Sequence, residues 1–331
     1  MIVYVTTRMG RRAITESYPL LPRDLRDRIR YVTYVELERQ HSLPLATYIF
    51  ADIERLLPPT TERAAAIWER LAASGEPVRL LNHPTRSLTR TRLLPTLFRD
   101  GINDFTVHPA DAPPPPSIRY PVFLRGAEDH NGARSELIHD GAMLESELLR
   151  VEASGLRRRH CLIVEFCDTA DAQGIYRKYD AYIAGDRILP TDIYMSSRWM
   201  LKWNNSRQFD GAPMSPAAML GEEIAFPRDF AHADQLRAIA RRAAIDYGRI
   251  DFSWLGDRIQ IWEINTNPDL VLPDLYEPAH RASDYGQQVL PGILESVFAM
   301  LRSLDCDGDP KIRIPMRPGV AALVSPGVAA P

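Results

Sequence analysis

The chain of 331 residues has few cysteines, no long apolar run and little excess charge. Cys161, Cys167 and Cys306 have no metal-binding spacing and leave an odd thiol, so a reducing cytoplasm is the expected setting. No apolar run approaches the ~18 residues of a membrane-spanning helix, and no membrane partner is expected. An apolar strand precedes the first arginines, the reverse of a signal peptide. The net charge of −3 gives no reason to expect a nucleic-acid partner.

Two common nucleotide-binding motifs are also missing. The chain contains neither a Gly-x-x-x-x-Gly-Lys phosphate loop nor a Gly-x-Gly-x-x-Gly fingerprint, so the folds that use them lose their main evidence. The apolar fraction of 45% and the charged fraction of 25% are ordinary for a globular protein. The length suffices for about two domains with a large core.

The most informative stretch runs from Tyr247 to Pro268. Residues 249–254 and 258–264 each alternate polar with apolar side chains, and Leu255-Gly256-Asp257 separates them, which predicts an antiparallel hairpin. On the first strand Arg249, Asp251 and Ser253 share one face. On the second strand we expect Ile261, Glu263 and Asn265 to share a face.

Across this hairpin Asp251 and Glu263 can lie side by side, with Asn265 one step beyond. Two carboxylates and an amide are the oxygen donors that Mg²⁺ prefers, and no His or Cys suggests a softer metal. The alternative is a surface hairpin whose acids are only solvated. The ending Glu263-Ile-Asn-Thr-Asn-Pro268 favours a site, because it has no evident packing purpose.

These motifs resemble the metal-binding core of ATP-grasp enzymes, especially the D-alanine–D-alanine ligase-like carboxylate–amine ligases. The resemblance implies that Asp251, Glu263 and Asn265 hold two Mg²⁺ ions, with Mn²⁺ as an alternative, on the phosphates of ATP. It also implies that Arg249 is catalytic and steadies the substrate carboxylate. One departure is Asp269, where the family often has glycine.

The phosphate contacts are expected from three further cations. The strand 120–125 ends in Arg125 and enters a glycine-bounded loop, 126–132, where backbone N–H groups could cradle phosphate. Glu128 and Asp129 in that loop must point away, or the loop has another role. Lys178 lies on a second predicted hairpin, and Asp180 beside it stands where many relatives have arginine.

Lys202 is the candidate for the γ-phosphate. It lies in the polar segment 196–206, whose two tryptophans fit either a mobile lid or a packed helix. Earlier in the chain, His83 and the arginines at 86, 90, 92 and 99 could reach substrate, but most are interpreted as a solvated helix face.

Nucleotide recognition is assigned to the end of the apolar strand 161–167. A lone acid in an apolar run needs a partner, and the resemblance implies that Glu165 reads adenine together with the backbone of Phe166 and Cys167. Asp168 or Asp171 would take the ribose.

The predicted fold is α/β (α+β): an ATP-grasp fold preceded by a small parallel α/β domain. Residues 1–112 form this N-terminal domain, and a polyproline spacer at 111–116 marks its boundary. Residues 117–304 form the ATP-grasp domain, and 305–331, rich in Pro, Gly and Ala, form a flexible tail.

The predicted function is that of an ATP-dependent carboxylate–amine ligase that forms an amide or peptide bond through an acyl phosphate. Its substrates would be a small-molecule or peptide acid and an amine, and a homodimer is left open. Two alternatives remain: an ATP-grasp kinase acting on a hydroxyl, and a nucleotide-binding regulatory protein without turnover.

Overall fold

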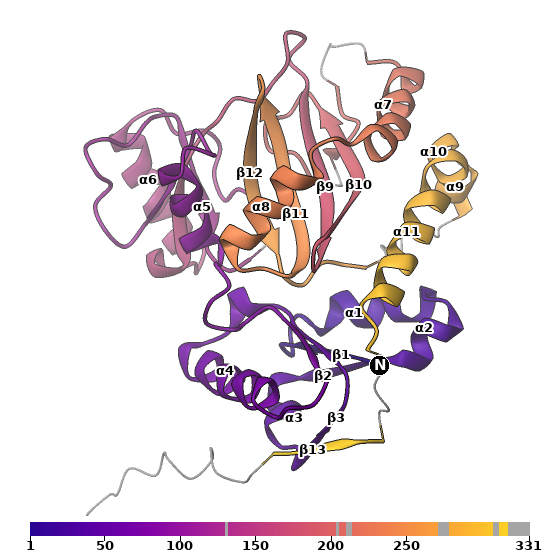
Figure 1. Cartoon of the computed structure of the whole chain (residues 1–331). Helices are drawn as coiled ribbons and strands as arrows, with labels where there is room; N and C mark the ends of the chain where they lie inside the picture. The colour runs from indigo at the N-terminus through magenta and orange to yellow at the C-terminus, as the bar shows by residue number, and fades with distance from the viewer. Residues whose placement is uncertain (130–131, 203–204, 210–213, 271–277, 307–310, 317–331) are drawn as a thin grey trace, which may run out of the picture.

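The computed structural model describes residues 1–129, 132–202, 205–209, 214–270, 278–306 and 311–316. Figure 1 shows an N-terminal α/β layer, drawn in indigo, beneath a larger antiparallel sheet, drawn in pink and orange. The α/β class expected from the sequence is confirmed. No helix in the ranges above is long and apolar enough to cross a membrane.

The N-terminal sheet has four parallel strands in the order β2-β1-β4-β5. Separate apolar clusters cover its two faces, which explains why the first strand of the chain is apolar throughout. The strands are β1 (Ile2–Thr6), β2 (Ile29–Thr33), β4 (Thr47–Phe50) and β5 (Arg79–Leu81). The helices of this part are α1 (Arg11–Ser17), α2 (Arg23–Arg28), α3 (Tyr34–Glu38) and α4 (Pro58–Ala72).

A three-stranded antiparallel sheet, in the order β6-β8-β7, follows. Its strands are β6 (Val107–Pro109), β7 (Val122–Gly126) and β8 (Cys161–Glu165), and α6 (Gly141–Ala153) packs on it. Because β6 precedes the polyproline segment and pairs with β8 after it, that segment joins two strands of one sheet. The boundary expected at residue 112 therefore does not separate the sheets.

The largest sheet is antiparallel, in the order β10-β9-β11-β12, and both predicted hairpins lie in it. Its strands are β9 (Tyr176–Ala184), β10 (Arg187–Ser196), β11 (Tyr247–Leu255) and β12 (Arg258–Asn265). One face packs against α5 (Arg90–Arg99) and α8 (Ala233–Ala243). The α7 helix (Pro216–Asp229) packs against β10. The opposite face of the sheet is left for polar residues.

The chain ends by returning to the N-terminal sheet. The helices α9 (Pro278–Ala282), α10 (Asp284–Gln288) and α11 (Leu290–Ser303) lead down beside the large sheet (Figure 1), and α11 joins the core around β1. Then β13 (Arg313–Pro315) pairs with β3 (Ser42–Pro44). The prediction of a flexible tail from residue 305 is wrong for residues 311–316, because they contain the strand β13 and it forms backbone hydrogen bonds with β3. The rest of the predicted tail, 307–310 and 317–331, lies outside the described residues.

Asn82, just after β5, fixes the start of β11 to the N-terminal sheet. Its amide nitrogen donates to the carbonyl oxygens of Phe50 (3.2 Å) and Tyr247 (2.8 Å). Its amide oxygen accepts from the backbone N–H groups of Asp246 (2.8 Å) and Tyr247 (3.0 Å). Asn82 has a left-handed φ of 62°, a conformation that asparagine tolerates better than most residues. This side chain therefore sets where the hairpin begins.

Candidate active site

Asp251 on β11 lies directly opposite Glu263 on β12, as the hairpin pattern predicted, and both are buried. The register shifts just after this pair, since Phe252 pairs with Ile261 and leaves Trp262 in a bulge. Ile261 packs in the apolar core with Phe252. The expectation that Ile261 and Glu263 share a face is therefore wrong, because the bulge turns Glu263 to the polar face.

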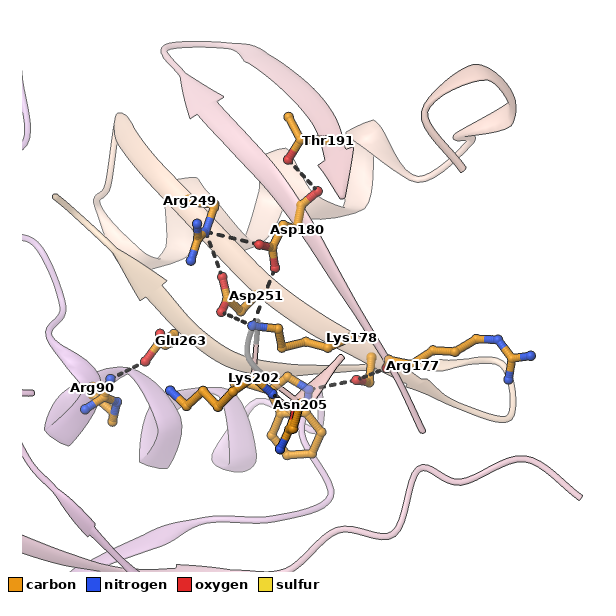
Figure 2. Close-up of polar contacts among 12 residues, drawn as sticks. Arg90, Arg177, Lys178, Asp180, Thr191, Lys202, Asn205, Arg249, Asp251 and Glu263 are labelled. Carbon is orange, nitrogen blue, oxygen red and sulfur yellow. Dashed lines mark hydrogen bonds and ion pairs between the residues drawn. The ribbon is translucent and has the colours of Figure 1, made fainter. Parts of the chain in front are cut away.

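The Asp251 carboxylate lies between two cations, as Figure 2 shows. Arg249 Nε is 3.2 Å from one carboxylate oxygen, and Lys178 Nζ is 3.0 Å from the other. Burial would raise the pKa of Asp251, but the charges of Lys178 and Arg249 outweigh it and hold that pKa below its usual value. The carboxylate is thus kept ionised in a nearly dry site.

A third acid, Asp180 on β9, pairs in register with Asp251 from the other side. It is fully buried, and it lies 3.3 Å from Arg249 Nε and 3.9 Å from Lys178 Nζ. Burial raises the pKa of Asp180. The positive charge of Arg249 opposes this rise, and the negative charge of Asp251 adds to it. The sequence pattern placed Asp180 beside Lys178 but could not show this register.

Glu263 is held by two arginines. Arg125 Nη2 lies 2.6 Å from its carboxylate, and Arg90 donates to the same oxygen. Arg90 is buried at the start of α5 and also donates to the carbonyl oxygens of Gly126 (3.1 Å) and Asp129 (2.8 Å). Arg90 therefore ties α5, the glycine-bounded loop and Glu263 together. The sequence alone leaves Arg90 in a set of arginines of which most are interpreted as a solvated helix face. A helix pattern does not reveal a partner 173 residues away.

The acids of the glycine-bounded loop point to other partners, as expected. The Asp129 carboxylate accepts from Arg134 at 2.6 Å, and a Glu128 oxygen lies 3.4 Å from Nδ1 of His160. The loop can therefore present its backbone and Arg125 to an anion without an acid between them.

A pocket of about 660 Å³, counting its open mouth, lies against this face of the sheet. One part of the lining is apolar and aromatic: Phe123, Phe166, Cys167, Trp199, Met200, Leu201 and Trp262. Another part is charged: Arg125, Lys178, Lys202, Asp251 and Glu263. The pocket thus combines an apolar surface with a cationic, oxygen-rich one.

Lys202, the candidate for the γ-phosphate, is among the residues that line this pocket. Gly132 leaves it room, since a Cβ at that position would lie only 2.8 Å from Cε of Lys202. Burial, and then the charge of Arg125, lower the pKa of Lys202 to about 8. In the described part of segment 196–206, residues 197–200 are bends, residues 201–202 have no regular structure, and no α-helix forms.

Phe166 and Cys167 line the pocket, but Glu165 is not part of its lining. The Glu165 carboxylate accepts from Nη2 (2.6 Å) and Nε (3.1 Å) of Arg119, and its other oxygen accepts from the Arg119 backbone N–H (3.2 Å). The N–H of Phe166 is bonded to the carbonyl of Pro121. The assignment of Glu165 to adenine therefore has no geometric support: the lone acid of the strand has its partner in Arg119.

The two ribose candidates differ. The Asp171 carboxylate closes its own turn, accepting from the N–H groups of Gln173 (2.8 Å) and Ile175 (2.9 Å), and it also pairs with Arg177 (2.6 Å). Asp168 is exposed and accepts from the Ala170 N–H (3.1 Å). Of the two, Asp168 is the acid that is less committed to local structure.

The residues after Glu263 have a packing purpose that the sequence did not reveal. Asn265 Oδ1 accepts from the N–H of Asn267 at 2.8 Å. Asn267 in turn accepts from Tyr4 (3.0 Å) and donates to the Gly10 carbonyl (2.9 Å), while Thr266 donates to Glu54 (2.6 Å). This ending therefore docks the hairpin on the loops that follow β1 and β4.

The donor set fits a hard cation, although the described residues contain no group of three or more His, Cys, Asp or Glu side chains arranged for a metal ion. Asp251 and Glu263 offer adjacent buried carboxylates, and Asn265 adds an amide two residues beyond Glu263. Oxygen donors of this kind suit Mg²⁺ when a ligand phosphate and water supply the remaining positions.

No protein-family model matches the sequence, and no curated protein matches it. Among solved structures, the chain is similar to D-alanine–D-alanine ligase from Bacillus anthracis, at 13% identity and a TM-score of 0.49, covering 92% of this chain and 97% of that one. It is also similar to N5-carboxyaminoimidazole ribonucleotide synthetase from Thermus thermophilus (17% identity, 80% and 71% covered, TM-score 0.42).

A third similar structure is the ATP-grasp ligase PsnB, at 12% identity, with 91% of this chain and 97% of that one covered and a TM-score of 0.45. The function proposed below rests on the residues of this chain.

Proposed function

We propose that this chain is an ATP-dependent carboxylate–amine ligase of the ATP-grasp type, which forms an amide through an acyl phosphate. The observation that carries the proposal is the placement of Asp251 opposite Glu263, with Arg249 and Lys178 bonded to Asp251 beside a pocket that also holds Arg125 and Lys202. Cations outnumber carboxylates in this group, which suits a polyanion such as the triphosphate of ATP.

The pocket suits a nucleotide in its two parts. The aromatic surface made by Phe123, Phe166 and Trp199 offers ring contacts to a base. Arg125, Lys178 and Lys202 would bind phosphate oxygens, and Asp168 is the remaining candidate for the ribose. Asp251, Glu263 and Asn265 would hold Mg²⁺, which when bound neutralises phosphate charge.

A carboxylate resists attack because it is already an anion. Transfer of the γ-phosphoryl group of ATP to a carboxylate oxygen forms an acyl phosphate and releases ADP. An amine then attacks the acyl carbon, the C–O bond to phosphate breaks, phosphate leaves, and the amine nitrogen loses a proton. The chain's own contribution is to position the reactants and balance their charge.

Arg249 favours a ligase over a kinase. A kinase acceptor is a neutral hydroxyl, whereas a ligase must hold an anionic carboxylate and an anionic tetrahedral intermediate. The guanidinium of Arg249 lies within 3.2 Å of Asp251, so it is beside the phosphate-binding part of the site. The substrates are proposed to be a small-molecule or peptide acid and an amine.

A matrix of acids and amines, screened for Mg²⁺-dependent ADP release, tests this proposal. Each active acid is then incubated with ATP and hydroxylamine in place of the amine. A ligase gives a hydroxamate with ADP and phosphate in equal amounts. Sustained ADP release into a phosphorylated hydroxyl compound, with no hydroxamate from any acid, would contradict it.

A further inference from the structure

The acids of the large sheet form a row across three strands. Asp180 on β9, Asp251 on β11 and Glu263 on β12 occupy successive register positions, so their backbones lie side by side. Asp251 and Glu263 line the pocket and Asp180 does not. Asp180 therefore lies at the inner end of the row, and its contacts with charged groups are those with Arg249 and Lys178.

Asp180 faces the same two cations as Asp251. Arg249 Nε lies 3.3 Å from Asp180 and 3.2 Å from Asp251, and Lys178 Nζ lies 3.9 Å and 3.0 Å from them. Neither carboxylate oxygen of Asp180 makes a hydrogen bond to any described residue, although the side chain is fully buried. Its contacts with Arg249 and Lys178 are thus ion pairs longer than those of Asp251.

This sharing matters once a metal–nucleotide complex enters. A metal ion needs the Asp251 oxygens that Arg249 and Lys178 now contact, so both cations then need another negatively charged group as counter-ion. Two cations that are mostly shielded from water would be destabilised without a counter-ion and would compete with the metal for Asp251. Asp180 lies within reach of both cations and outside the pocket, so it can keep them neutralised.

We propose that Asp180 is a positioning residue, the counter-ion that holds Arg249 and Lys178 in place while Asp251 binds the metal–nucleotide complex. The proposal rests on the proposed function for its metal and nucleotide. It goes further by giving a role to a buried acid that the proposed reaction does not use.

Binding of Mn²⁺ in the presence of the ATP analogue AMPPNP, measured by electron paramagnetic resonance, tests this role without turnover. In Asp180→Asn, Asp251 is the one carboxylate among the described residues that still forms an ion pair with Arg249 and Lys178, so the Kd of Mn²⁺ is expected to rise about 10-fold or more. Turnover should recover at high Mg²⁺, because the defect is competition for one carboxylate. A merely structural defect would lower turnover equally at every Mg²⁺ concentration.

Glu223→Gln is the control. Glu223 is also a buried acid whose pKa is raised by burial, but the cation that it pairs with, at 2.6 Å, is Arg207. Its Kd for Mn²⁺ should change less than twofold. A Kd for Asp180→Asn within twofold of the wild type would overturn the proposal.

A second pair of variants tests the proposal if Asp180→Asn alone folds poorly. The double variant Asp180→Asn with Lys178→Met removes one cation together with the acid. It should still bind Mn²⁺ more weakly than Lys178→Met alone, because Arg249 then keeps its ion pair with Asp251 and loses the one with Asp180. Equal Mn²⁺ affinity of these two variants would also overturn the proposal. Failure of the wild-type chain to bind Mn²⁺ with AMPPNP would instead contradict the proposed function.

Discussion

Asp251 and Glu263 face each other across β11 and β12, and each carboxylate is held by two cations, Arg249 and Lys178 on one side, Arg90 and Arg125 on the other. The pair is thus an acidic centre enclosed by basic side chains. A metal ion alone would have to displace these cations from the two carboxylates. A triphosphate that carries the metal could bind Arg125 and Lys178 itself as the metal reaches the carboxylates.

Removing either acid should abolish ATP turnover and leave the fold intact. Asp251→Asn and Glu263→Gln each delete a ligand charge with little change in volume, and loss of one electrostatic group at a reaction centre costs about 10²–10³-fold in rate. The measurement is Mg²⁺-dependent ADP formation beside a melting curve. Asp257→Asn, in the exposed turn of the same hairpin, should be unaffected. Near-normal turnover of either active-site variant would remove the hairpin from the active site.

Lys202 should give nucleotide binding a pH dependence. Its pKa is lowered to about 8, so the ligand-free side chain loses its proton as the pH rises through 8. Only the protonated form attracts phosphate, so affinity for ATP should fall above pH 8. Lys202→Arg should remove this fall because arginine keeps its charge, and Lys202→Met should bind ATP weakly at every pH. A fall in affinity that persists unchanged in Lys202→Met would assign it to another group.

Glu165→Ala should lower stability without changing the choice of nucleotide. The variant removes the carboxylate that accepts from Arg119 and from the buried Thr106 N–H, and leaving a buried donor without its acceptor costs ~1–3 kcal/mol. Melting temperature should drop, and affinity for ATP and GTP should change by equal factors. A selective loss of ATP affinity would restore Glu165 as an adenine contact.

Asn82 should be important for the junction between the sheets. Asn82→Gly keeps the left-handed backbone but removes four hydrogen bonds, and a lowered melting temperature equivalent to about 2 kcal/mol or more is expected. The melting temperature of Asn82→Ala should be lower still, because a φ of 62° is unfavourable for alanine. If Asn82→Gly melts like the wild type, the side chain does not hold β11 to the N-terminal sheet.

The local patterns predicted much of the site. Alternation and a Gly-Asp turn placed Asp251 opposite Glu263, and the apolar strand ending in Arg125 placed that cation at the pocket. Both inferences depend on neighbours within a strand or hairpin. The bulge at Trp262 was missed because a period of two cannot show one extra residue.

The errors concern contacts between distant segments. Glu165 needed a partner, but its strand could not tell adenine from Arg119, 46 residues away. The ending 263–268 showed no packing purpose, and most arginines near Arg90 were interpreted as a solvated helix face. The partners that correct both interpretations, Tyr4 for Asn267 and Glu263 for Arg90, lie 263 and 173 residues away. The polyproline segment resembled a domain boundary, since the pairing of β6 with β8 leaves no local signal.

The most direct test of the central claim follows an oxygen atom. An acid that supports turnover is labelled with ¹⁸O in its carboxyl group and incubated with ATP, Mg²⁺ and the amine. If an acyl phosphate forms, one labelled oxygen passes into the released phosphate for each amide made. Arg249→Ala should suppress this transfer by ~10²-fold or more while ATP still binds. Label that stays in the acid during sustained ADP release would contradict the ligase proposal.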